Sequence, residues 1–375
     1  MALITYLTRI QFDHGAVRLL PDELKLARIA RPLIVTDPGV TKAGLLQRVL
    51  DVLPVNMPYA VYDQTPSNPT EAAVYAVAER FAEFGADGLI GLGGGSAMDL
   101  AKAASVLAGG HPPPLWDYAV VNGGVARITP KVAPMIAIPT TSGTGSEVGR
   151  GAVIIFENGR KSAVVSPLII PKLALCDPEL TLDLPAGLTA ATGMDAIAHN
   201  LETFLAPTVN PPAEAIALDG LARGLAWIER AVADGADRDA RWHMMMSSTQ
   251  GAMSFQKGLG AVHALSHPLG TLGLHHGTLN AVVMPAVLRF NESHVGDKYA
   301  RVRVACGLSA DQDLATFVAD LNRRLGLPPS LGAMGVTAAR CDGLVDHVLA
   351  DHCAATNPRP MTADDVRALF RDALG

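Results

Sequence analysis

The strongest constraint on the fold is an alternation of short β-like runs with helical patterns in the first half of the chain. The β-like runs are rich in Val, Ile and Leu, and the third of them leads into consecutive glycines. Strands that alternate with helices predict a parallel, doubly wound sheet. The expected strands are 31–37, 60–63, 87–92 and 135–138, and the helices between them include 45–52 and 71–84.

The pattern changes after Asp183-Leu184-Pro185. Before it, the runs 152–156 and 162–166 flank Asn158-Gly159, a pair typical of a β-hairpin turn. After it, the segments are rich in Ala, Leu and Met and have helical periodicity. We therefore expect an α/β Rossmann-like, dinucleotide-binding domain over 1–185 and an all-α domain over 186–375, with the chemistry in a cleft between their two cores.

Composition excludes several classes of protein. The 375 residues are 49% hydrophobic and 18% charged, as in a packed globular protein. The net charge of −6, with no cluster of Lys and Arg, argues against a nucleic-acid partner. No apolar run approaches the ~18 residues of a membrane span, the N-terminal stretch lacks signal-peptide features, and the four cysteines lie far apart. We expect a cytoplasmic protein without a membrane partner.

A glycine loop, Gly93-Gly94-Gly95-Ser96, follows an expected strand and begins a helix. Its glycines would let backbone N–H groups approach an anion closely, and the positive end of the helix would stabilise a phosphate. The spacing is neither GxGxxG nor a P-loop. A glycine turn that only caps a helix is the alternative, and Ser96 with Asp99 fits a capping pair.

Two further segments strengthen the phosphate-site interpretation. Asp37 ends the first strand, where a dinucleotide presents its ribose 2′-hydroxyl, and its charge favours NAD over NADP. The alternative is a turn residue in Asp37-Pro38-Gly39. The hydroxyl-rich loop 139–147 follows another strand, and open α/β sheets bind ligands at that edge. A turn leading into the hairpin is the alternative for this loop.

Histidines and one carboxylate recur at helical spacing in the second half. Asp195 and His199 are separated by four residues, His263 and His267 repeat that spacing, and a His-His pair follows at 275–276. Residues four apart share one face of a helix. Buried imidazoles and carboxylates need partners, so we expect a divalent-metal site. Oxygen and imidazole donors suit Fe²⁺, Zn²⁺ or Mn²⁺, and they do not identify the metal.

Four motifs taken in this order resemble the iron-containing (group III) alcohol dehydrogenases. The resemblance extends over nearly the whole chain and implies the same two-domain fold, shared with dehydroquinate synthase, with NAD(H) and a divalent metal, Fe²⁺ ahead of Zn²⁺. The motifs are Gly93-Gly94-Gly95-Ser96-x-x-Asp99, Thr140-Thr141-x-Gly143-Thr144-Gly145-Ser146-Glu147, Gly193-Met194-Asp195-x-x-x-His199 and His263-x-x-x-His267-Pro268-x-Gly270.

The resemblance also implies roles for individual residues. His267 would be a histidine that does not bind the metal and takes part in proton transfer. The stretch between His267 and His276 is shorter than in the family, so His275 stays open as an alternative to His276. The implied metal ligands are Asp195, His199, His263 and His276, and the implied cofactor contacts are Asp37, Asn68, Gly94, Gly95, Ser96, Asp99, Thr140, Thr141, Thr144, Lys161 and Thr181.

Within the family, the chain looks closest to the 4-hydroxybutyrate dehydrogenases, which interconvert succinic semialdehyde and 4-hydroxybutyrate. The stretches around Arg150 and Lys257 carry this similarity, and either cation would suit a carboxylate substrate. The alternative for both is a surface side chain or a cofactor contact. A general alcohol or diol dehydrogenase, acting on lactaldehyde or simple alcohols, is the main alternative function. A dehydroquinate synthase-like lyase is less favoured, because few cations lie near the metal residues.

The expected partners are a small aldehyde or alcohol and a second copy of the chain. The strand-like run 4–12 would suit pairing across a homodimer, and members of the family commonly dimerise. The sequence leaves open the oligomeric state, the metal and the physiological direction.

Overall fold

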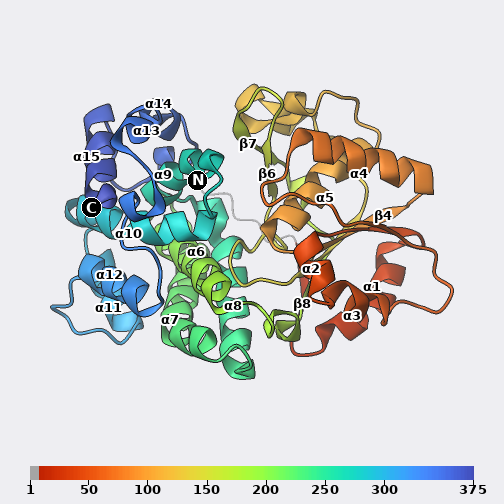
Figure 1. Cartoon of the computed structure of the whole chain (residues 1–375), viewed down its shortest axis with the longest axis horizontal. Helices are drawn as coiled ribbons and strands as arrows, with labels where there is room; N and C mark the ends of the chain where they lie inside the picture. The colour runs from red at the N-terminus through yellow and green to blue at the C-terminus, as the bar shows by residue number, and fades with distance from the viewer. Residues whose placement is uncertain (1–7) are drawn as a thin grey trace. The chain divides into compact units, whose positions relative to one another are not determined.

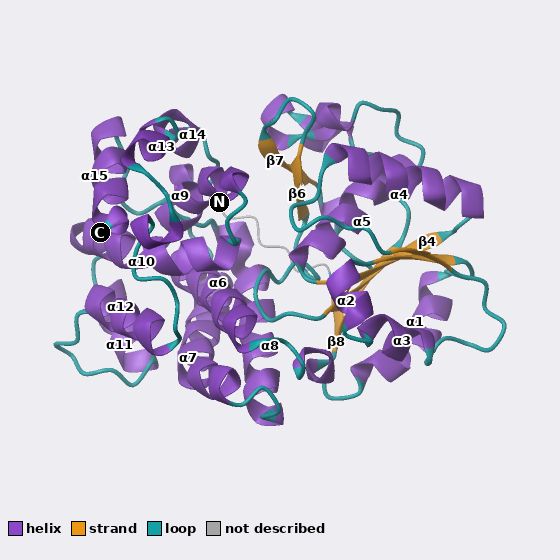
Figure 2. Ribbon diagram, viewed as in Figure 1, coloured by secondary structure: helices purple, strands orange, loops and turns teal. Residues whose placement is uncertain are grey.

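The computed structural model of the protein describes residues 8–375. These residues divide into two compact units. The sheet unit comprises 8–141 and Gly145–Asp183, and the helical unit comprises Leu184–Gly375 together with Ser142–Thr144. All the strands of the described chain belong to the sheet unit, as Figure 2 shows.

The sheet unit is built on six parallel strands in the order β1-β8-β5-β4-β2-β3. From β1 to β5, consecutive strands along the chain are joined through helices, whereas β5 and β8 are joined through the segment that holds an antiparallel hairpin. The bounds of these strands are β1 Arg9–Phe12, β2 Pro32–Val35, β3 Ala60–Tyr62, β4 Gly88–Gly93, β5 Met135–Pro139 and β8 Leu173–Cys176. A separate antiparallel hairpin consists of β6 (Gly151–Ile155) and β7 (Lys161–Val165).

Helices cover both faces of the sheet (Figure 1). Strand β2 shows why, because Leu33 and Val35 pack into one hydrophobic core and Ile34 packs into another. Residues two apart on a strand share a face, so a strand that is apolar throughout needs cover on both sides. On one face lie α4 (Glu71–Phe84) and α5 (Gly95–Ala108), and on the other lie α1 (Leu20–Ala27), α2 (Pro38–Lys42) and α3 (Leu45–Leu50).

The helical unit has one continuous core, in which α6 packs against α7, α8 and α10. Polar side chains fix the starts of several helices, because the first backbone N–H groups of a helix lack partners within it. Asn210 caps α7 and Asp237 caps α8, and Thr362 forms a capping box with Asp365 at α15. The bounds are α6 Ala186–Leu205, α7 Pro211–Ala233, α8 Arg238–Ser254, α9 Ala261–Leu269, α10 His276–Asn291, α11 Lys298–Ala305, α12 Leu314–Arg324, α13 Ala338–Asp342, α14 Val345–Leu349 and α15 Ala363–Leu374.

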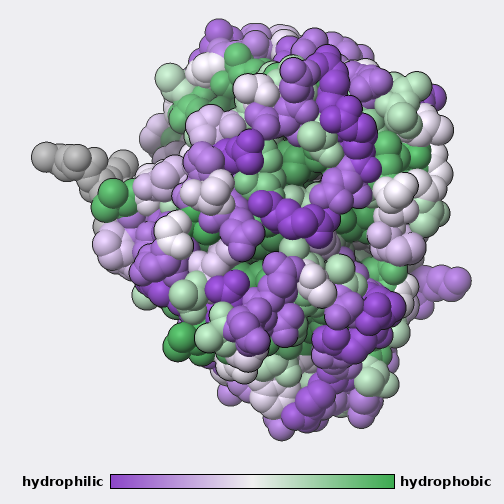
Figure 3. Space-filling model, turned by 90° about the vertical axis from the view of Figure 1, so that its left-hand side faces the viewer, coloured by the Kyte–Doolittle hydropathy of each residue, from purple (hydrophilic) through white to green (hydrophobic). Residues whose placement is uncertain are grey.

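The predicted fold class is confirmed: a doubly wound parallel sheet precedes an all-helical part. The hairpin around Asn158-Gly159 is confirmed as well. Of the run 4–12, residues 9–12 form β1 and pair with β8 of the same sheet, while residues 4–7 lie outside the described residues. No helix among residues 8–375 is both long and apolar enough to cross a membrane. The face of the helical unit drawn in Figure 3 is largely hydrophilic, with hydrophobic residues in small patches.

The capping pair expected at the glycine loop is wrong. Helix α5 begins at Gly95 with Gly94 as its N-cap, and no side chain caps it. Ser96 lies inside the helix and donates its hydroxyl to the carbonyl of Ser67 at 2.6 Å. Asp99 accepts the hydroxyl of Ser146 and the backbone N–H of Val153, so it ties α5 to the hairpin.

Candidate active site

Three imidazoles surround one carboxylate oxygen inside the helical unit. Asp195 Oδ1 lies 3.6 Å from His199 Nε2, and 3.7 Å from Nε2 of both His263 and His276. Asp195 and His199 come from consecutive turns of α6, His263 from the first turn of α9, and His276 from the first residue of α10. Three helices that are distant in sequence therefore bring three imidazole nitrogens close to one carboxylate oxygen, and the ligand atoms of Asp195, His199 and His263 all lie within 4.8 Å of one another.

Burial gives this group its electrostatic character. Burial alone would raise the pKa of Asp195, but the neighbouring imidazoles outweigh it and hold that pKa well below its usual range. Burial lowers the pKa of His199 to about 4, against the opposing effect of Asp195. For His263 burial acts in the same direction, but hydrogen bonds to Asp195 and Glu202 prevail and raise its pKa to about 9. The group thus centres on an ionised carboxylate that favours a positive charge beside it.

The donor set fits a divalent cation. Four ligand atoms held about 2.1 Å from one ion in a tetrahedron lie about 3.4 Å apart, close to the separations measured from Asp195 Oδ1. One carboxylate oxygen with imidazole nitrogens suits Fe²⁺ or Zn²⁺. His275, the alternative to His276, precedes α10, and its Nδ1 lies 3.4 Å from the hydroxyl of Thr278. The geometry therefore brings His276 to the group.

Two polar residues of this site escaped the sequence analysis. Asn280 follows His276 by one helical turn and donates its amide to Asp195 Oδ1 at 2.7 Å. The same nitrogen lies 3.2 Å from Nε2 of His263 and of His276. Glu202 accepts the Nδ1–H of His263 at 2.5 Å. Each follows a predicted ligand on the same helix: Asn280 comes four residues after His276, and Glu202 comes seven residues after Asp195. Helical spacing was therefore a signal in the sequence that would have found them.

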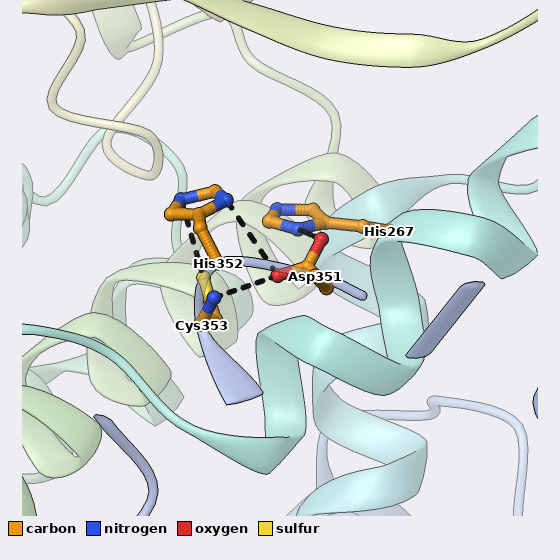
Figure 4. A group of neighbouring side chains, drawn as sticks. All are labelled: His267, Asp351, His352 and Cys353. Atoms are coloured by element: carbon orange, nitrogen blue, oxygen red, sulfur yellow. Dashed lines mark hydrogen bonds and ion pairs between the residues drawn. The ribbon is translucent and has the colours of Figure 1, made fainter. Parts of the chain in front are cut away.

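A second cluster of possible ligands lies beside the first, in His267, Asp351, His352 and Cys353 (Figure 4). His267 Nδ1 and Asp351 Oδ2 are 2.9 Å apart, and Asp351 Oδ1 accepts the backbone N–H of Cys353. The rings of His267 and His352 are stacked at an angle of 17°, with their centroids 5.8 Å apart. The donor atoms of His267 and Asp351 are thus already paired with each other and with the backbone. We interpret the cluster as a hydrogen-bonded support for His267.

His267 itself lies next to the metal-type group. Its ring stacks on that of His276, with centroids 5.3 Å apart. Its side chain is 19% exposed, whereas that of His263 is 2% exposed. Asp351, 84 residues away, orients it, and no local sequence pattern pointed to that partner.

In the sheet unit, the glycine loop is packed against two other loops. Gly93 has a φ of 148°, and a Cβ there would lie 2.9 Å from the Cβ of Ala97, so glycine is required. A Cβ on Gly94 would lie 3.4 Å from the side chain of Thr141. The N–H of Thr140 bonds the carbonyl of Gly93 at 3.0 Å. These predicted cofactor residues therefore meet where β4 and β5 end.

Other predicted cofactor residues join the same neighbourhood. Lys161 Nζ donates to Asn68 Oδ1 at 3.1 Å. Burial lowers the pKa of Lys161, and the nearby charge of Asp99 opposes that effect. Asp37 Oδ1 caps α2 through the N–H groups of residues 39 and 40, and a Cβ on Gly93 would lie 3.2 Å from Asp37 Oδ2. Asp37 is thus a helix cap whose second oxygen lies beside the glycine loop.

Two further predicted cofactor residues are Thr144 and Thr181. Thr144 belongs to the short segment grouped with the helical unit. Thr181 is buried and donates its hydroxyl to the carbonyl of Pro178, which completes a local 3₁₀ turn. The structure gives Thr181 this local bond.

The two predicted substrate cations differ sharply. Arg150 is exposed immediately before β6. Lys257 is buried, and its ammonium donates to the carbonyls of Thr203, Phe204 and Ala206 at the end of α6. Glu214 Oε1 lies 3.4 Å from the same nitrogen. Lys257 therefore stabilises the C-terminus of α6 through its dipole and carbonyls, and its position gives no support to a substrate contact.

Comparison with known proteins covers both units. Residues 8–178 match the family described as "Iron-containing alcohol dehydrogenase", and residues 189–374 match "Fe-containing alcohol dehydrogenase family, C-terminal". The chain is 57% identical to 4-hydroxybutyrate dehydrogenase of Cupriavidus necator over the full length of both proteins. It resembles the crystal structure of a 1,3-propanediol oxidoreductase with a TM-score of 0.94 and 31% identity, covering 100% of both chains. It also resembles sulfoacetaldehyde reductase of Bifidobacterium kashiwanohense in complex with NAD⁺, with a TM-score of 0.90 and 26% identity, covering 100% of this chain and 98% of the other.

Proposed function

This chain belongs to the iron-containing alcohol dehydrogenase family, and on that premise we propose that it interconverts succinic semialdehyde and 4-hydroxybutyrate with NAD(H) and a divalent metal. The observation that carries the dehydrogenase activity is the convergence of three Nε2 atoms on the oxygen of Asp195. The choice of substrate rests on the full-length relative that carries this activity in its name. Fe²⁺ is the preferred metal, because it names the family and fits the donor set.

When bound, the metal supplies Lewis acidity at the carbonyl oxygen and the nicotinamide supplies the hydride. The chain's own residues do the rest. Asp195, His199 and His263, which are buried, and the partly exposed His276 hold the cation. Asp351 accepts from Nδ1 of His267, so the imidazolium form of this side chain can give its Nε2 proton to the carbonyl oxygen of the aldehyde as it is reduced, and the neutral form can take that proton back in the reverse direction. An imidazole suits this step because its ordinary pKa is near neutrality.

We assign the cofactor to the edge of the sheet where the glycine loop, Thr140 and Thr141 lie. The backbone N–H groups at the start of α5 suit a pyrophosphate, because the positive end of the helix dipole points there. The carboxylate of Asp37 beside this loop favours NAD over NADP, since it would repel a 2′-phosphate. A structural relative in complex with NAD⁺ supports the same assignment.

We assign the substrate's carboxylate to Arg150. Its guanidinium is exposed, and planar guanidinium groups bind carboxylates through two parallel hydrogen bonds. Two relatives act on small anionic compounds by name, 4-hydroxybutyrate and sulfoacetaldehyde. A general alcohol or diol dehydrogenase is the competing function, favoured by the likeness to 1,3-propanediol oxidoreductase.

The test is steady-state oxidation of NADH by the metal-loaded protein with succinic semialdehyde and with butanal. We expect a much larger kcat/KM for the semialdehyde, and Arg150→Ala should remove about 2 kcal/mol of that preference, or roughly thirtyfold. Arg160→Ala, which removes another arginine close by in the sequence, is the matched control and should change neither rate. Equal rates for the two aldehydes would leave a general alcohol dehydrogenase.

We also infer that the protein works as a homodimer in the cytoplasm. Strand β1 is an edge strand, paired among the described residues with β8 alone, and such an edge suits pairing with a second copy. The four cysteines are free, which suits a reducing compartment. Light scattering coupled to size-exclusion chromatography should give twice the chain mass of 39.2 kDa. A mass equal to one chain would exclude the dimer.

A further inference from the structure

A buried glutamate links two of the helices that supply the proposed metal ligands. Glu202 lies on α6, two helical turns after Asp195, and is 4% exposed. Its carboxylate contacts the first turn of α9, where His263 lies. A buried charge without partners is costly, so the groups that face Glu202 indicate what it does.

The hydrogen bonds that the structure gives this carboxylate all come from donors on helix α9. Oε1 accepts the backbone N–H of Val262 at 2.6 Å. Oε2 accepts the ring Nδ1–H of His263 at 2.5 Å and lies 3.3 Å from the backbone nitrogen of the same residue. An ionised carboxylate accepts hydrogen bonds and cannot donate them. All three contacts are therefore satisfied by the charged form of Glu202.

The backbone contacts explain why the glutamate approaches so closely. Helix α9 begins after Gly260, which has no side chain to cap the first N–H groups. Asn357 accepts the N–H of Ala261 in its place, and Glu202 accepts the N–H of Val262. A Cβ on Gly260 would lie 2.8 Å from Glu202 Oε1 and from Asn357 Oδ1. The glycine therefore makes room for the two side chains that cap the helix.

The contact with the ring has a chemical consequence. A neutral imidazole carries one N–H, and a carboxylate acceptor at Nδ1 fixes that hydrogen there. Nε2 of His263 then presents its lone pair, and this is the atom that lies 3.7 Å from Asp195 Oδ1. A metal ion needs that lone pair, so the tautomer determines whether His263 can be a ligand.

The Nδ1 contacts of the other two ligand histidines are longer. His199 Nδ1 lies 3.3 Å from the carbonyl of Gly143, and His276 Nδ1 lies 3.4 Å from the hydroxyl of Ser266. Both acceptors are neutral and more distant than Glu202 is from His263. Hydrogen bonds to charged groups are shorter and about twice as strong as neutral ones. Of these three Nδ1 contacts, that of His263 is the one with a charged acceptor.

We propose that Glu202 is the positioning residue of the metal site, which fixes the tautomer and the orientation of His263 and thereby sets the affinity for the ion. The proposal rests on the metal site of the proposed function. It does not depend on the substrate or on the nicotinamide cofactor.

The principal variant is Glu202→Gln, which keeps the shape of the side chain. The glutamine amide has a single acceptor oxygen, whereas two donors, Val262 N–H and His263 Nδ1–H, each need an acceptor. Titration of the metal-free protein with Co²⁺ against a chromophoric chelator should show a dissociation constant 10–100-fold larger than that of the wild type. Glu71→Gln is the matched control: Glu71 is equally buried and accepts from Tyr75 and the Glu157 N–H in the sheet unit. Its Co²⁺ affinity should not change.

Proton NMR of the Co²⁺ form separates positioning from a structural effect. A ring N–H on a cobalt-bound histidine gives a resonance shifted far outside the usual range, and it disappears in D₂O when the proton exchanges. The wild type should show one such resonance that exchanges slowly, because the Nδ1–H of His263 is buried against Glu202. In Glu202→Gln this resonance should move or exchange rapidly. The wild-type measurement also tests the proposal if the variant does not fold, because the absence of a slowly exchanging resonance would overturn it.

The outcomes distinguish the two proposals. An unchanged Co²⁺ affinity and an unchanged resonance in Glu202→Gln would refute the role of Glu202 and leave the dehydrogenase standing. A wild type that binds Co²⁺ as expected, but reduces no aldehyde when loaded with Fe²⁺ or Zn²⁺, would refute the proposed function and leave the role of Glu202 standing.

Discussion

The glycine loop of the sheet unit and the histidine group of the helical unit are built in opposite ways. The loop is a short continuous stretch, and it presents backbone groups where a strand gives way to a helix. The histidine group assembles side chains from α6, α9 and α10, and each of them is held by a partner distant in sequence. The loop depends on local backbone conformation, whereas the histidine group depends on how helices pack.

This difference predicts how substitutions in each region affect ligand binding and folding. A change in the loop should affect the affinity for one ligand and leave the rest of the fold in place. A change in the histidine group leaves neighbouring buried polar atoms unpaired, so it should remove metal binding and destabilise the packing as well. Substitutions in and around the two regions test this contrast.

The largest expected effect is in the histidine group. His263→Ala should abolish retention of the metal and lower kcat/KM by more than about a thousandfold, because one donor atom is lost and Glu202 and Asp195 lose a shared partner. Metal content by plasma mass spectrometry and NADH oxidation measure the two effects. Survival of both would show that the ligand set is wrong.

The neighbouring pair 275–276 provides a matched comparison for that experiment. His276→Ala should release the metal, and His275→Ala should retain it, since only His276 lies beside Asp195. The reverse result would move the fourth ligand to His275.

The next effect concerns a lysine that sequence similarity placed at the substrate. Lys257→Met should lower the free energy of unfolding by about 3 kcal/mol, because the carbonyls at the end of α6 and Glu214 lose their buried cation. The preference for succinic semialdehyde over butanal should not change. Urea denaturation and the two kcat/KM values measure this. Normal stability with a lost preference would make Lys257 a substrate contact after all.

A third effect is the pH dependence of metal affinity. The raised pKa of His263, about 9, means that the imidazole carries a second proton at neutral pH in the metal-free protein. The metal must displace that proton from Nε2, so the affinity should rise about tenfold for each pH unit between 7 and 9 and level off above. Chelator competition across this range measures the slope. An affinity independent of pH would show that Nε2 is already unprotonated.

The smallest effect lies at the glycine loop. Asp37→Asn keeps an acceptor for the N-cap of α2 but removes the negative charge beside Gly93. The ratio of kcat/KM for NADPH to that for NADH should rise several-fold to about tenfold, with little loss of stability. Asp37→Ala should raise the ratio similarly and also destabilise the protein by about 1 kcal/mol through loss of the cap. An unchanged ratio in both variants would limit Asp37 to capping.

Much of the sheet unit could be read from local pattern. The helix expected over 71–84 has the same bounds as α4, and the strand 135–138 differs from β5 by one residue. Such agreement follows from periodicity, because apolar residues that alternate with turn signals leave few choices of element. The capping pair at Ser96 failed because the helix begins two residues earlier, with Gly94 as its N-cap, which frees Ser96 to bond Ser67.

The sequence by itself determined the two kinds of architecture, the turn at Asn158-Gly159 and which residue types have metal-binding chemistry. These follow from interactions within a few residues, such as the helical spacing of Asp195 and His199. Only the tertiary structure decided which polar atoms meet. It brought the carboxylate of Glu202 to the ring of His263 and that of Asp351 to the ring of His267. It also surrounded the ammonium of Lys257 with backbone carbonyls. The physical reason is that a buried polar group must find a partner wherever packing brings one, and packing joins segments whose separation in the chain carries no local signal.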